Sequence, residues 1–319
     1  MRVCRKTNRE SHLPPSLPEK NGTAKRIEGV HMRSAKVIVL AGQSNAVGVG
    51  HVKCLKRSFT DAKIKEYFNG YENIKINYYS HDKKSDGFTI TTTNCTELHK
   101  DTIGPEVGMA EYLNGKFPDE EYFIVKFAVG GASLRRDFLS PSSGGYYNIK
   151  EFKNEYSGFI DAFFTGKPLK AGWCYNGLVS ILNDSIGYLK EKGFSPEIIG
   201  FCWMQGESDG GSLENVNNYK VYFDNFVNDL KKEFSQYIEK CVFVDAGISE
   251  VWNCHREMNA FKKNYAKEHS RFIYVDTIEN GLTTKYEPIE SPDICHYDCE
   301  SVIKLGRLFA KNIMNQVEI

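Results

Sequence analysis

The amino-acid sequence predicts an α/β fold with a mainly parallel sheet. Three observations support this prediction: short continuous apolar runs, segments with apolar residues at helical spacing between them, and polar or glycine-rich turns where the runs end. Continuous apolar runs are typical of strands that are buried on both faces, as they are in parallel sheets. Strands that alternate with helices along the chain indicate crossover connections between parallel strands.

Seven segments have the length and apolar character of strands. In chain order they are 36–41, 74–80, 88–93, 122–128, 198–204, 241–246 and 272–276. The strongest are the first (KVIVLA), the fourth (YFIVKFA) and the fifth (IIGFCWM). The third fits either an additional strand or the arm of a hairpin.

Helical spacing of apolar residues marks the segments 106–117, 178–192, 215–234 and 301–314. By contrast, residues 132–172 have no clear period and contain the turn sequence PSSGG. Loops of that length are uncommon in compact domains unless they are functional or disordered. We therefore expect a surface insertion near the functional site.

Composition excludes several classes of function. The 319 residues include 41 basic and 41 acidic side chains, so the formal net charge is zero. Electrostatic capture of nucleic acid or of an anionic membrane is therefore not expected. No stretch approaches the roughly 20 apolar residues that cross a bilayer. The equal numbers of basic and acidic side chains fit a protein that acts on a small or neutral substrate.

Residues 1–34 are expected to form a disordered tail and residues 35–319 a single domain. The tail is polar, contains proline, and lacks the apolar segment of a secretory signal. Met32 lies just before the first strand and is an alternative start of translation to Met1. The nine cysteines, an odd number, favour reduced thiols in a cytoplasmic protein.

Polar or glycine-rich segments follow the predicted strands at four places. They are 42–45 (GQSN), 130–131 (GG), 205–209 (QGESD) and 293–296 (DICH). Ligands of open parallel sheets bind beyond the carboxyl ends of the strands. The fold is therefore expected to bring these distant segments to one edge of the sheet.

Ser44 follows the first strand in a tight turn and is expected to open a helix, whose positive end favours developing negative charge. Two other interpretations fit this serine. One is a helix N-cap, which is a common place for serine. The other is a phosphate loop with Gly42, Gly48 and Gly50. The chain disfavours this loop because it lacks the Gly-Lys-Ser/Thr step and the G-x-G-x-x-G spacing.

A nucleophilic serine needs a base and a carboxylate that orients the base. Asp293 and His296 are three residues apart, after the last strand and just before the last helix, so one loop can hold both groups. The alternative is a surface histidine beside an acidic residue. Cys295, His296 and Cys299 also suggest a metal site, but a fourth ligand and the C-x-x-C spacing are missing.

Acyl transfer also needs hydrogen-bond donors for the oxyanion. The backbone N–H groups of Ser44 and of Gly130 or Gly131 are candidates, because glycine lets a substrate approach closely. The side-chain amide of Gln205 is a third candidate. Taken alone, the glycine pair also fits an ordinary turn, and Gln205 and Glu207 also fit a polar strand end.

Five motifs in register resemble one enzyme family. VLAGQSNAVG, GPEVG, KFAVGGASL, WMQGESD and DICH occur in this order. Together they resemble the sialate O-acetylesterase-like carbohydrate esterases, which include acetylxylan esterases and are a branch of the SGNH hydrolases. The similarity runs from about residue 35 to the last helix. It implies a three-layer α/β/α sandwich with a flavodoxin-like, mainly parallel sheet, and chemistry without a metal or an organic cofactor.

The resemblance also implies roles for individual residues. Ser44 would be the nucleophile, Asp293 and His296 would complete the catalytic triad, and the donors named above would form the oxyanion hole. Further candidates for support of the site or for substrate contact are Gln43, Asn45, Glu106, Glu207 and Arg135. Among these, Glu207 is expected to orient its neighbours and Glu106 to be structural. Arg135 fits a substrate carboxylate, as on a sialic acid, but pairing with a local acid is the favoured interpretation.

The sequence departs from the family pattern at three positions. Ala46 replaces a frequent methionine, and Ala132 and Ser133 stand where many members carry threonine. These departures leave the implied chemistry intact and bear on the substrate. Trp173 and Tyr175 fit either stacking on a sugar ring or the core face of the next helix.

The expected activity is hydrolysis of a small acyl ester, an acetyl ester, on a carbohydrate such as sialic acid or xylan. The expected partner is thus a small molecule or oligosaccharide that bears O-acetyl groups; the sequence leaves the oligomeric state open. Two alternatives remain: a lipase- or thioesterase-like SGNH hydrolase of other acyl esters, and a non-catalytic carbohydrate-binding protein on the same fold. A nucleotide-binding protein is disfavoured by the missing phosphate-loop lysine.

Overall fold

The computed structural model describes residues 33–81, 83–93, 101–153, 169–288 and 290–317. The main element of these residues is an eight-stranded sheet. Its strands are β1 (Arg33–Gly42), β3 (Tyr71–Ser80), β4 (Lys83–Lys84), β5 (Thr89–Thr91), β7 (Tyr122–Ala128), β8 (Phe194–Met204), β9 (Val242–Ala246) and β10 (Phe272–Val275). A separate ribbon pairs β2 (Gly50–His51) with β6 (Thr102–Ile103).

The strand order of the sheet is β10-β9-β8-β1-β7-β3-β4, and β5 also pairs with β3. Every neighbouring pair from β10 to β3 is parallel. Only the short strands β4 and β5 pair antiparallel, both with β3. The predicted mainly parallel α/β fold is therefore confirmed.

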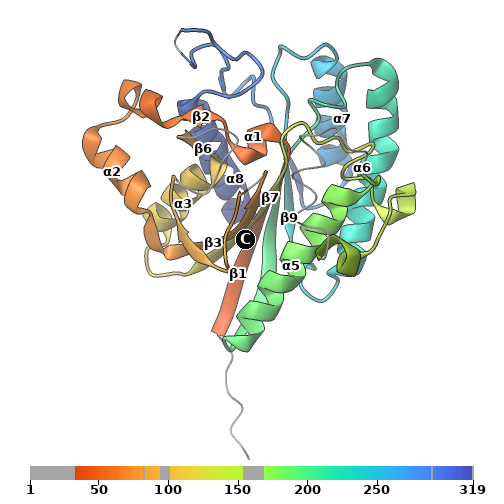
Figure 1. Ribbon diagram of the computed structural model, residues 1–319, viewed down its shortest axis with the longest axis horizontal. Coiled ribbons are helices and arrows are strands. Elements are labelled where there is room, and N and C mark those ends of the chain that lie inside the picture. The colour runs from red at the N-terminus through yellow and green to blue at the C-terminus, as the bar shows by residue number, and fades with distance from the viewer. Residues whose placement is uncertain (1–32, 82, 94–100, 154–168, 289, 318–319) are drawn as a thin grey trace, which may run out of the picture. The chain divides into compact units, whose positions relative to one another are not determined.

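Helices cover both faces of the sheet. They are α1 (Ser44–Val47), α2 (Asp61–Asn69), α3 (Pro105–Lys116), α5 (Trp173–Glu191), α6 (Leu213–Glu233), α7 (His255–Glu268) and α8 (Cys299–Val317), with 3-10 turns at η1 (Val52–Arg57) and η2 (Pro141–Ser143). Helices α3 and α8 pack together on one face, and α5, α6 and α7 lie on the other (Figure 1). This is the three-layer arrangement that the sequence predicts.

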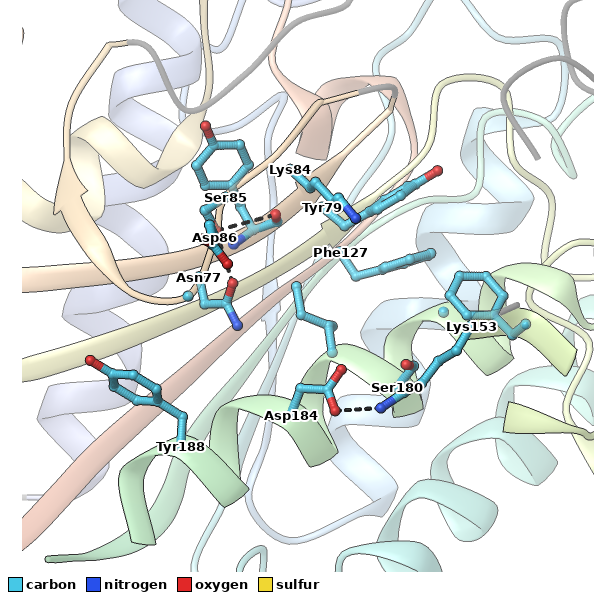
Figure 2. A pocket seen from close by; sticks show the side chains of 15 residues that line it. Asn77, Tyr79, Lys84, Ser85, Asp86, Phe127, Lys153, Ser180, Asp184 and Tyr188 are labelled. Carbon is cyan, nitrogen blue, oxygen red and sulfur yellow. Dashed lines mark hydrogen bonds and ion pairs between the residues drawn. The ribbon is translucent and has the colours of Figure 1, made fainter. Parts of the chain in front are cut away.

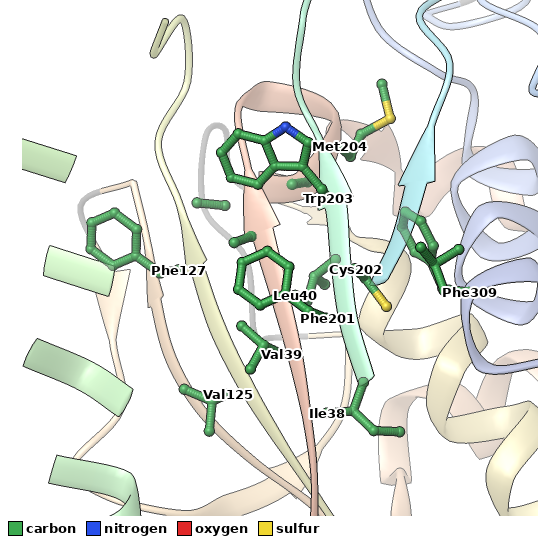
Figure 3. Packing of buried hydrophobic residues seen from close by; sticks show 14 of the residues in the cluster. Ile38, Val39, Leu40, Val125, Phe127, Phe201, Cys202, Trp203, Met204 and Phe309 are labelled. Carbon is green, nitrogen blue, oxygen red and sulfur yellow. The ribbon is translucent and has the colours of Figure 1, made fainter. Parts of the chain in front are cut away.

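The core is centred on β1, which lies between β7 and β8. Its residues alternate between two apolar layers, as strand geometry requires. Figure 3 shows Val39 and Phe201 on the side of Phe127, while Ile38 lies on the side of Phe309 of α8. These side chains are almost fully buried. Each contributes roughly 1.5–3 kcal/mol of apolar burial, which holds the end of β1 in place.

Strand β1 begins earlier than predicted. Arg33 and Ser34 pair in parallel with Phe194 and Ser195 of β8, so the strand starts three residues before the expected Lys36. The expected tail of residues 1–34 therefore extends two residues too far. Residues 1–32, including both possible start methionines, lie outside the described part.

Part of the predicted surface insertion is in fact core. Leu134 and Phe138 are fully buried. Phe138 packs edge-on against Phe127 and Trp203, at centroid distances of 6.0 and 5.1 Å. The aromatic residues of this segment follow neither a helical nor a strand period, so the sequence did not indicate that any of them is buried. Residues 154–168 of the same segment lie outside the described part.

Two helices, α2 and α7, have no counterpart among the predicted segments. The buried residues of α7 are Met258, Lys262 and Tyr265. A lysine therefore occupies the middle of the stripe that faces the core, where an apolar residue is the usual signal. Helix α2 buries only Tyr67, so it lacks the run of buried apolar residues by which the other helices were predicted.

Candidate active site

Ser44 is the first residue of α1, directly beyond the end of β1. Gly42 makes this turn possible, with φ of +145° and no room for a side chain. A Cβ there would lie 1.9 Å from the carbonyl oxygen of Met204. The Gln43 N–H donates to that same oxygen at 2.9 Å, so the turn is fixed to the end of β8. Ser44 is 6% exposed. Its hydroxyl makes no hydrogen bond within the described ranges.

The predicted Asp293–His296 pair is joined in the structure. Oδ2 of Asp293 lies 2.5 Å from Nδ1 of His296, and Oδ1 accepts the N–H of Cys295 at 3.0 Å. The N–H of His296 also donates to the carbonyl of Asp293 at 3.2 Å. The imidazole is thus oriented through Nδ1.

Asn45 connects the Ser44 turn with the His296 loop. Its Oδ1 accepts the N–H of Tyr297 at 3.0 Å, and its Nδ2 donates to Oε1 of Glu207 at 2.8 Å. Asn45 is fully buried. Since it directly follows Ser44 and Tyr297 directly follows His296, these two bonds bring the ends of β1 and β8 and the His296 loop together.

Glu207 lies in the protein interior beneath this junction. Burial raises the pKa of its carboxyl, and the hydrogen bond from Asn45 and the charges of Lys262 and His296 oppose that rise. Oε2 of Glu207 has no hydrogen-bond partner among the described residues. Glu207 is thus a buried carboxyl group that accepts a hydrogen bond from the amide of Asn45.

Lys262 of α7 pairs with a second buried acid, Asp245, and its charge also acts on Glu207. Its Nζ donates to Oδ1 of Asp245 at 2.5 Å and to the carbonyls of Gln205 and Ala246 at 2.6 and 2.9 Å. Burial raises the pKa of Asp245 to about 6, an effect that Lys262 opposes and Glu207 reinforces. The ends of β8 and β9 below the site are therefore joined by a buried charge network that the sequence did not reveal.

The glycine pair forms a tight turn after β7. The N–H of Ala132 donates to the carbonyl of Val129 at 3.2 Å, and Gly131 has φ of +72°. This is the sign pattern of a type II turn, which needs glycine at its third position. Oγ of Ser208 donates to the carbonyl of Gly131 at 2.9 Å. Because Ser208 follows Glu207, the turn stands beside the end of β8.

Gln205 does not point outward as an oxyanion donor would. Its Nε2 donates to Oδ2 of Asp209 at 2.7 Å and lies 3.2 and 3.3 Å from Oε1 of Gln43 and the carbonyl of Ala132. Gln205 is fully buried. Oε1 of Gln43 also accepts the N–H of Ser208 at 3.1 Å. Both glutamines therefore connect the loops around Ser44 from inside.

Glu106 supports the site from the opposite side of the sheet. Nζ of Lys126, on β7, donates to Oε2 of Glu106 and to the carbonyl of Val47, each at 2.7 Å. Lys126 and Glu106 are both fully buried. The pair holds the last residue of α1, which agrees with a structural role for Glu106.

Three side chains considered for substrate contact have partners within the protein. Arg135 donates to the carbonyl of Ser208 at 2.7 Å and pairs with Asp209 at 3.3 Å, so the local-pairing interpretation fits its position. Trp173 and Tyr175 are buried at the start of α5. They belong to the core face of that helix.

His81 is a residue near the site that sequence reasoning passed over. It lies directly after β3, is buried, and has φ of +55°. Its Nδ1 accepts the N–H of Gly130 at 3.2 Å. No sequence pattern marks this contact, because it depends on β3 ending beside the glycine turn.

A separate hollow of about 400 Å³ lies between β3 and α5. Figure 2 shows Tyr79 and Phe127 on its sheet side and Asp184 of α5 opposite, where Asp184 pairs with Lys153 at 2.5 Å. None of the predicted triad residues lines it.

Within the described ranges, no group of three or more His, Cys, Asp or Glu side chains is placed to hold a metal ion. The described cysteines, Cys295 and Cys299 among them, are free thiols. The helices in this part of the chain are also too short or too polar to cross a bilayer.

Comparison with known proteins identifies the family. The model of the family "carbohydrate esterase, sialic acid-specific acetylesterase" matches residues 34–315. The chain belongs to this family. Sequence comparison with curated proteins finds no match.

Several solved structures share the fold of this chain. A protein from Arabidopsis thaliana is 16% identical, with a TM-score of 0.60, and the match covers 88% of this chain and 98% of that one. NanS is also 16% identical, with a TM-score of 0.56 and coverage of 90% and 99%. A carbohydrate acetylesterase from Xanthomonas citri is 11% identical, with a TM-score of 0.52 and coverage of 89% and 56%. At these identities the likeness is one of fold.

Proposed function

We propose that this member of the carbohydrate esterase family hydrolyses a small acyl ester, an acetyl ester, on a sugar through an acyl-enzyme on Ser44. The observation that carries the proposal is the Asp293–His296 hydrogen bond in a loop that Asn45 fastens to the residue next to Ser44. A base oriented by a carboxylate, beside a serine at a turn, is the arrangement that activates a hydroxyl.

In the first half-reaction, Oγ of Ser44 attacks the ester carbonyl carbon while Nε2 of His296 takes the hydroxyl proton. The tetrahedral intermediate then collapses, the bond to the sugar oxygen breaks, and His296 returns the proton to the leaving hydroxyl. In the second half-reaction, water attacks the acyl-serine with His296 as base, and acetate leaves as Ser44 regains its proton. Proton transfer by a positioned base contributes about 10²–10⁴-fold.

The oxyanion is held in this proposal by the N–H groups of Ser44 and Gly131. Neither group donates to another of the described residues, whereas the N–H of Gly130 is taken by His81. Gln205 is assigned to positioning rather than to direct donation, because its amide donors face Asp209 and the protein interior. This revises the expectation that Gln205 is a third donor.

The substrate class follows from the family, whose description names sialic acid-specific acetylesterases. An O-acetylated sialic acid is therefore the first candidate, and acetylated xylan fragments are the second. Parallel assays of turnover on the two substrates would show which one the enzyme prefers. A preference for long acyl chains would instead favour the lipase- or thioesterase-like alternative.

The direct test is Ser44→Ala with a chromogenic acetate ester. The variant should fold as the wild type does, by circular dichroism, and lose turnover. Undiminished turnover in Ser44→Ala would contradict the proposal. A wild-type protein that binds the sugar but turns over no ester would favour the non-catalytic alternative.

A further inference from the structure

His81 occupies a backbone conformation that few residues adopt. Its φ of +55° lies in the left-handed region, which glycine adopts readily and which asparagine, aspartate and histidine adopt more often than other side chains do. Backbone outliers of this kind gather at functional sites. This conformation places the buried imidazole of His81 just beyond the end of β3, next to the turn at Gly130 and Gly131.

Two hydrogen bonds fix His81 to β7 and to the turn that follows it. Its N–H donates to the carbonyl of Ala128 at 2.7 Å, and its Nδ1 accepts the N–H of Gly130 at 3.2 Å. Strand pairing explains the proximity, because Ser80 is in register with Ala128. Since Nδ1 accepts a proton here, the imidazole is the neutral tautomer that carries its proton on Nε2.

The turn is therefore held from both sides. The N–H of Gly130 is bound by His81, and the carbonyl of Gly131 is bound by Oγ of Ser208 at 2.9 Å. The peptide between these two points carries the N–H of Gly131. In a type II turn this central peptide lies across the turn, so its N–H takes no part in the closing bond. Gly131 is exposed, and its N–H donates to no described residue.

We infer that His81 is a positioning residue of the oxyanion hole. Its imidazole fixes Gly130 and thereby aims the N–H of Gly131 at the carbonyl that Ser44 attacks. This inference rests on the proposed esterase function. A donor fixed before the reaction stabilises the developing oxyanion without reorganisation, which is why a strained histidine at this point serves catalysis.

Two substitutions separate positioning from mere packing. Asparagine tolerates the left-handed conformation and places Oδ1 where Nδ1 of histidine lies, so His81→Asn keeps an acceptor for Gly130. Glycine relieves the backbone strain and removes the acceptor, so His81→Gly keeps the fold and frees the turn. A role in backbone strain alone predicts that the glycine variant is tolerated. A role in packing alone predicts similar losses in both variants, since neither side chain fills the space of the imidazole.

The experiment compares kcat and KM for a chromogenic acetate ester among wild type, His81→Asn, His81→Gly and Ser44→Ala. We expect kcat of His81→Gly to fall by about 10-fold or more with KM nearly unchanged, since loss of one oxyanion donor costs roughly 10²–10³-fold. His81→Asn should stay within about 3-fold of wild type. Equal kcat in wild type and His81→Gly, or equal losses in both His81 variants, would overturn the inference.

A second measurement needs no substitution. The ¹⁵N NMR spectrum of the wild-type protein, with His81 assigned, should show Nδ1 without a proton and Nε2 with one. A proton on Nδ1 would overturn the inference even where His81→Gly does not fold. An inactive wild-type protein is a different result, because it overturns the proposed esterase function itself.

Discussion

Nδ2 of Asn45 donates to Oε1 of Glu207 at 2.8 Å, and both side chains are buried. This bond links the residue after Ser44 to the end of β8. The other end of the Asn45 amide accepts the N–H of Tyr297, which follows His296. One amide side chain therefore sets the separation between the proposed nucleophile and its base, and Glu207 sets the orientation of that amide.

Glu207→Ala should lower kcat by about 10–100-fold. The substitution leaves Nδ2 of Asn45 buried without an acceptor, which costs roughly 1–3 kcal/mol, and it frees the contact that aligns Ser44 with His296. Glu207→Gln retains an Oε1 acceptor and is the matched control, with activity within about 5-fold of wild type. Steady-state kinetics on an acetate ester provides the comparison. Equal activity of the alanine and glutamine variants would refute the orienting role.

Asp293→Asn should lower kcat by about 10²–10⁴-fold with little change in stability. An amide N–H facing Nδ1 of His296 would favour the tautomer protonated on Nε2, which cannot accept the Ser44 proton. Oδ1 can still accept the N–H of Cys295, so the loop should keep its shape. Glu290→Gln, an exposed acid in the same loop, is the control. Full activity of Asp293→Asn would show that His296 needs no carboxylate.

Lys126→Met should destabilise the fold by about 3–5 kcal/mol, because it leaves Glu106 buried without its cation. The double variant Lys126→Met with Glu106→Gln removes both charges and should recover part of that loss. Urea unfolding of the three proteins measures the difference. If the single variant is as stable as the double variant, the buried pair is not what secures the end of α1.

Titration of Asp245 should lower the free energy of unfolding as the pH rises from about 4 to about 6. Burial raises its pKa from 3.8 to about 6 in the folded protein. In that window the unfolded chain releases the proton that the folded chain still holds, so the folded state loses stability relative to acid pH. A shift of about two units corresponds to roughly 3 kcal/mol at most.

The reference for Asp245 is Asp245→Asn, which cannot titrate. The unfolding free energy of wild type minus that of the variant should decrease from pH 4 to pH 7. Urea titrations at several pH values across this range provide the measurement. A difference that stays constant, or that increases with pH, would contradict the raised pKa of Asp245.

Much of the site was predictable because it consists of short motifs at strand ends. Ser44, Glu207 and the Asp293–His296 pair each lie within a contiguous motif, and parallel strands place their carboxyl ends at one edge. The apolar runs likewise marked the central strands, since both faces of these strands are buried, as Ile38 and Val39 of β1 show.

The remaining features depend on three-dimensional contacts without a local signature. His81 acts on Gly130 only because β3 and β7 end side by side. Lys262 is a charged residue on a core-facing stripe, and its partner Asp245 lies on another element. The direction of the Gln205 amide is set by Asp209 four residues later, a choice that the sequence leaves open.

The central claim is that Ser44 is the nucleophile. Its most direct test is covalent labelling with a fluorophosphonate, followed by intact mass and peptide mapping. The account predicts one adduct per chain, located on Ser44, and none in Ser44→Ala. An adduct at another residue, or no adduct in a wild-type protein that hydrolyses acetate esters, would contradict it.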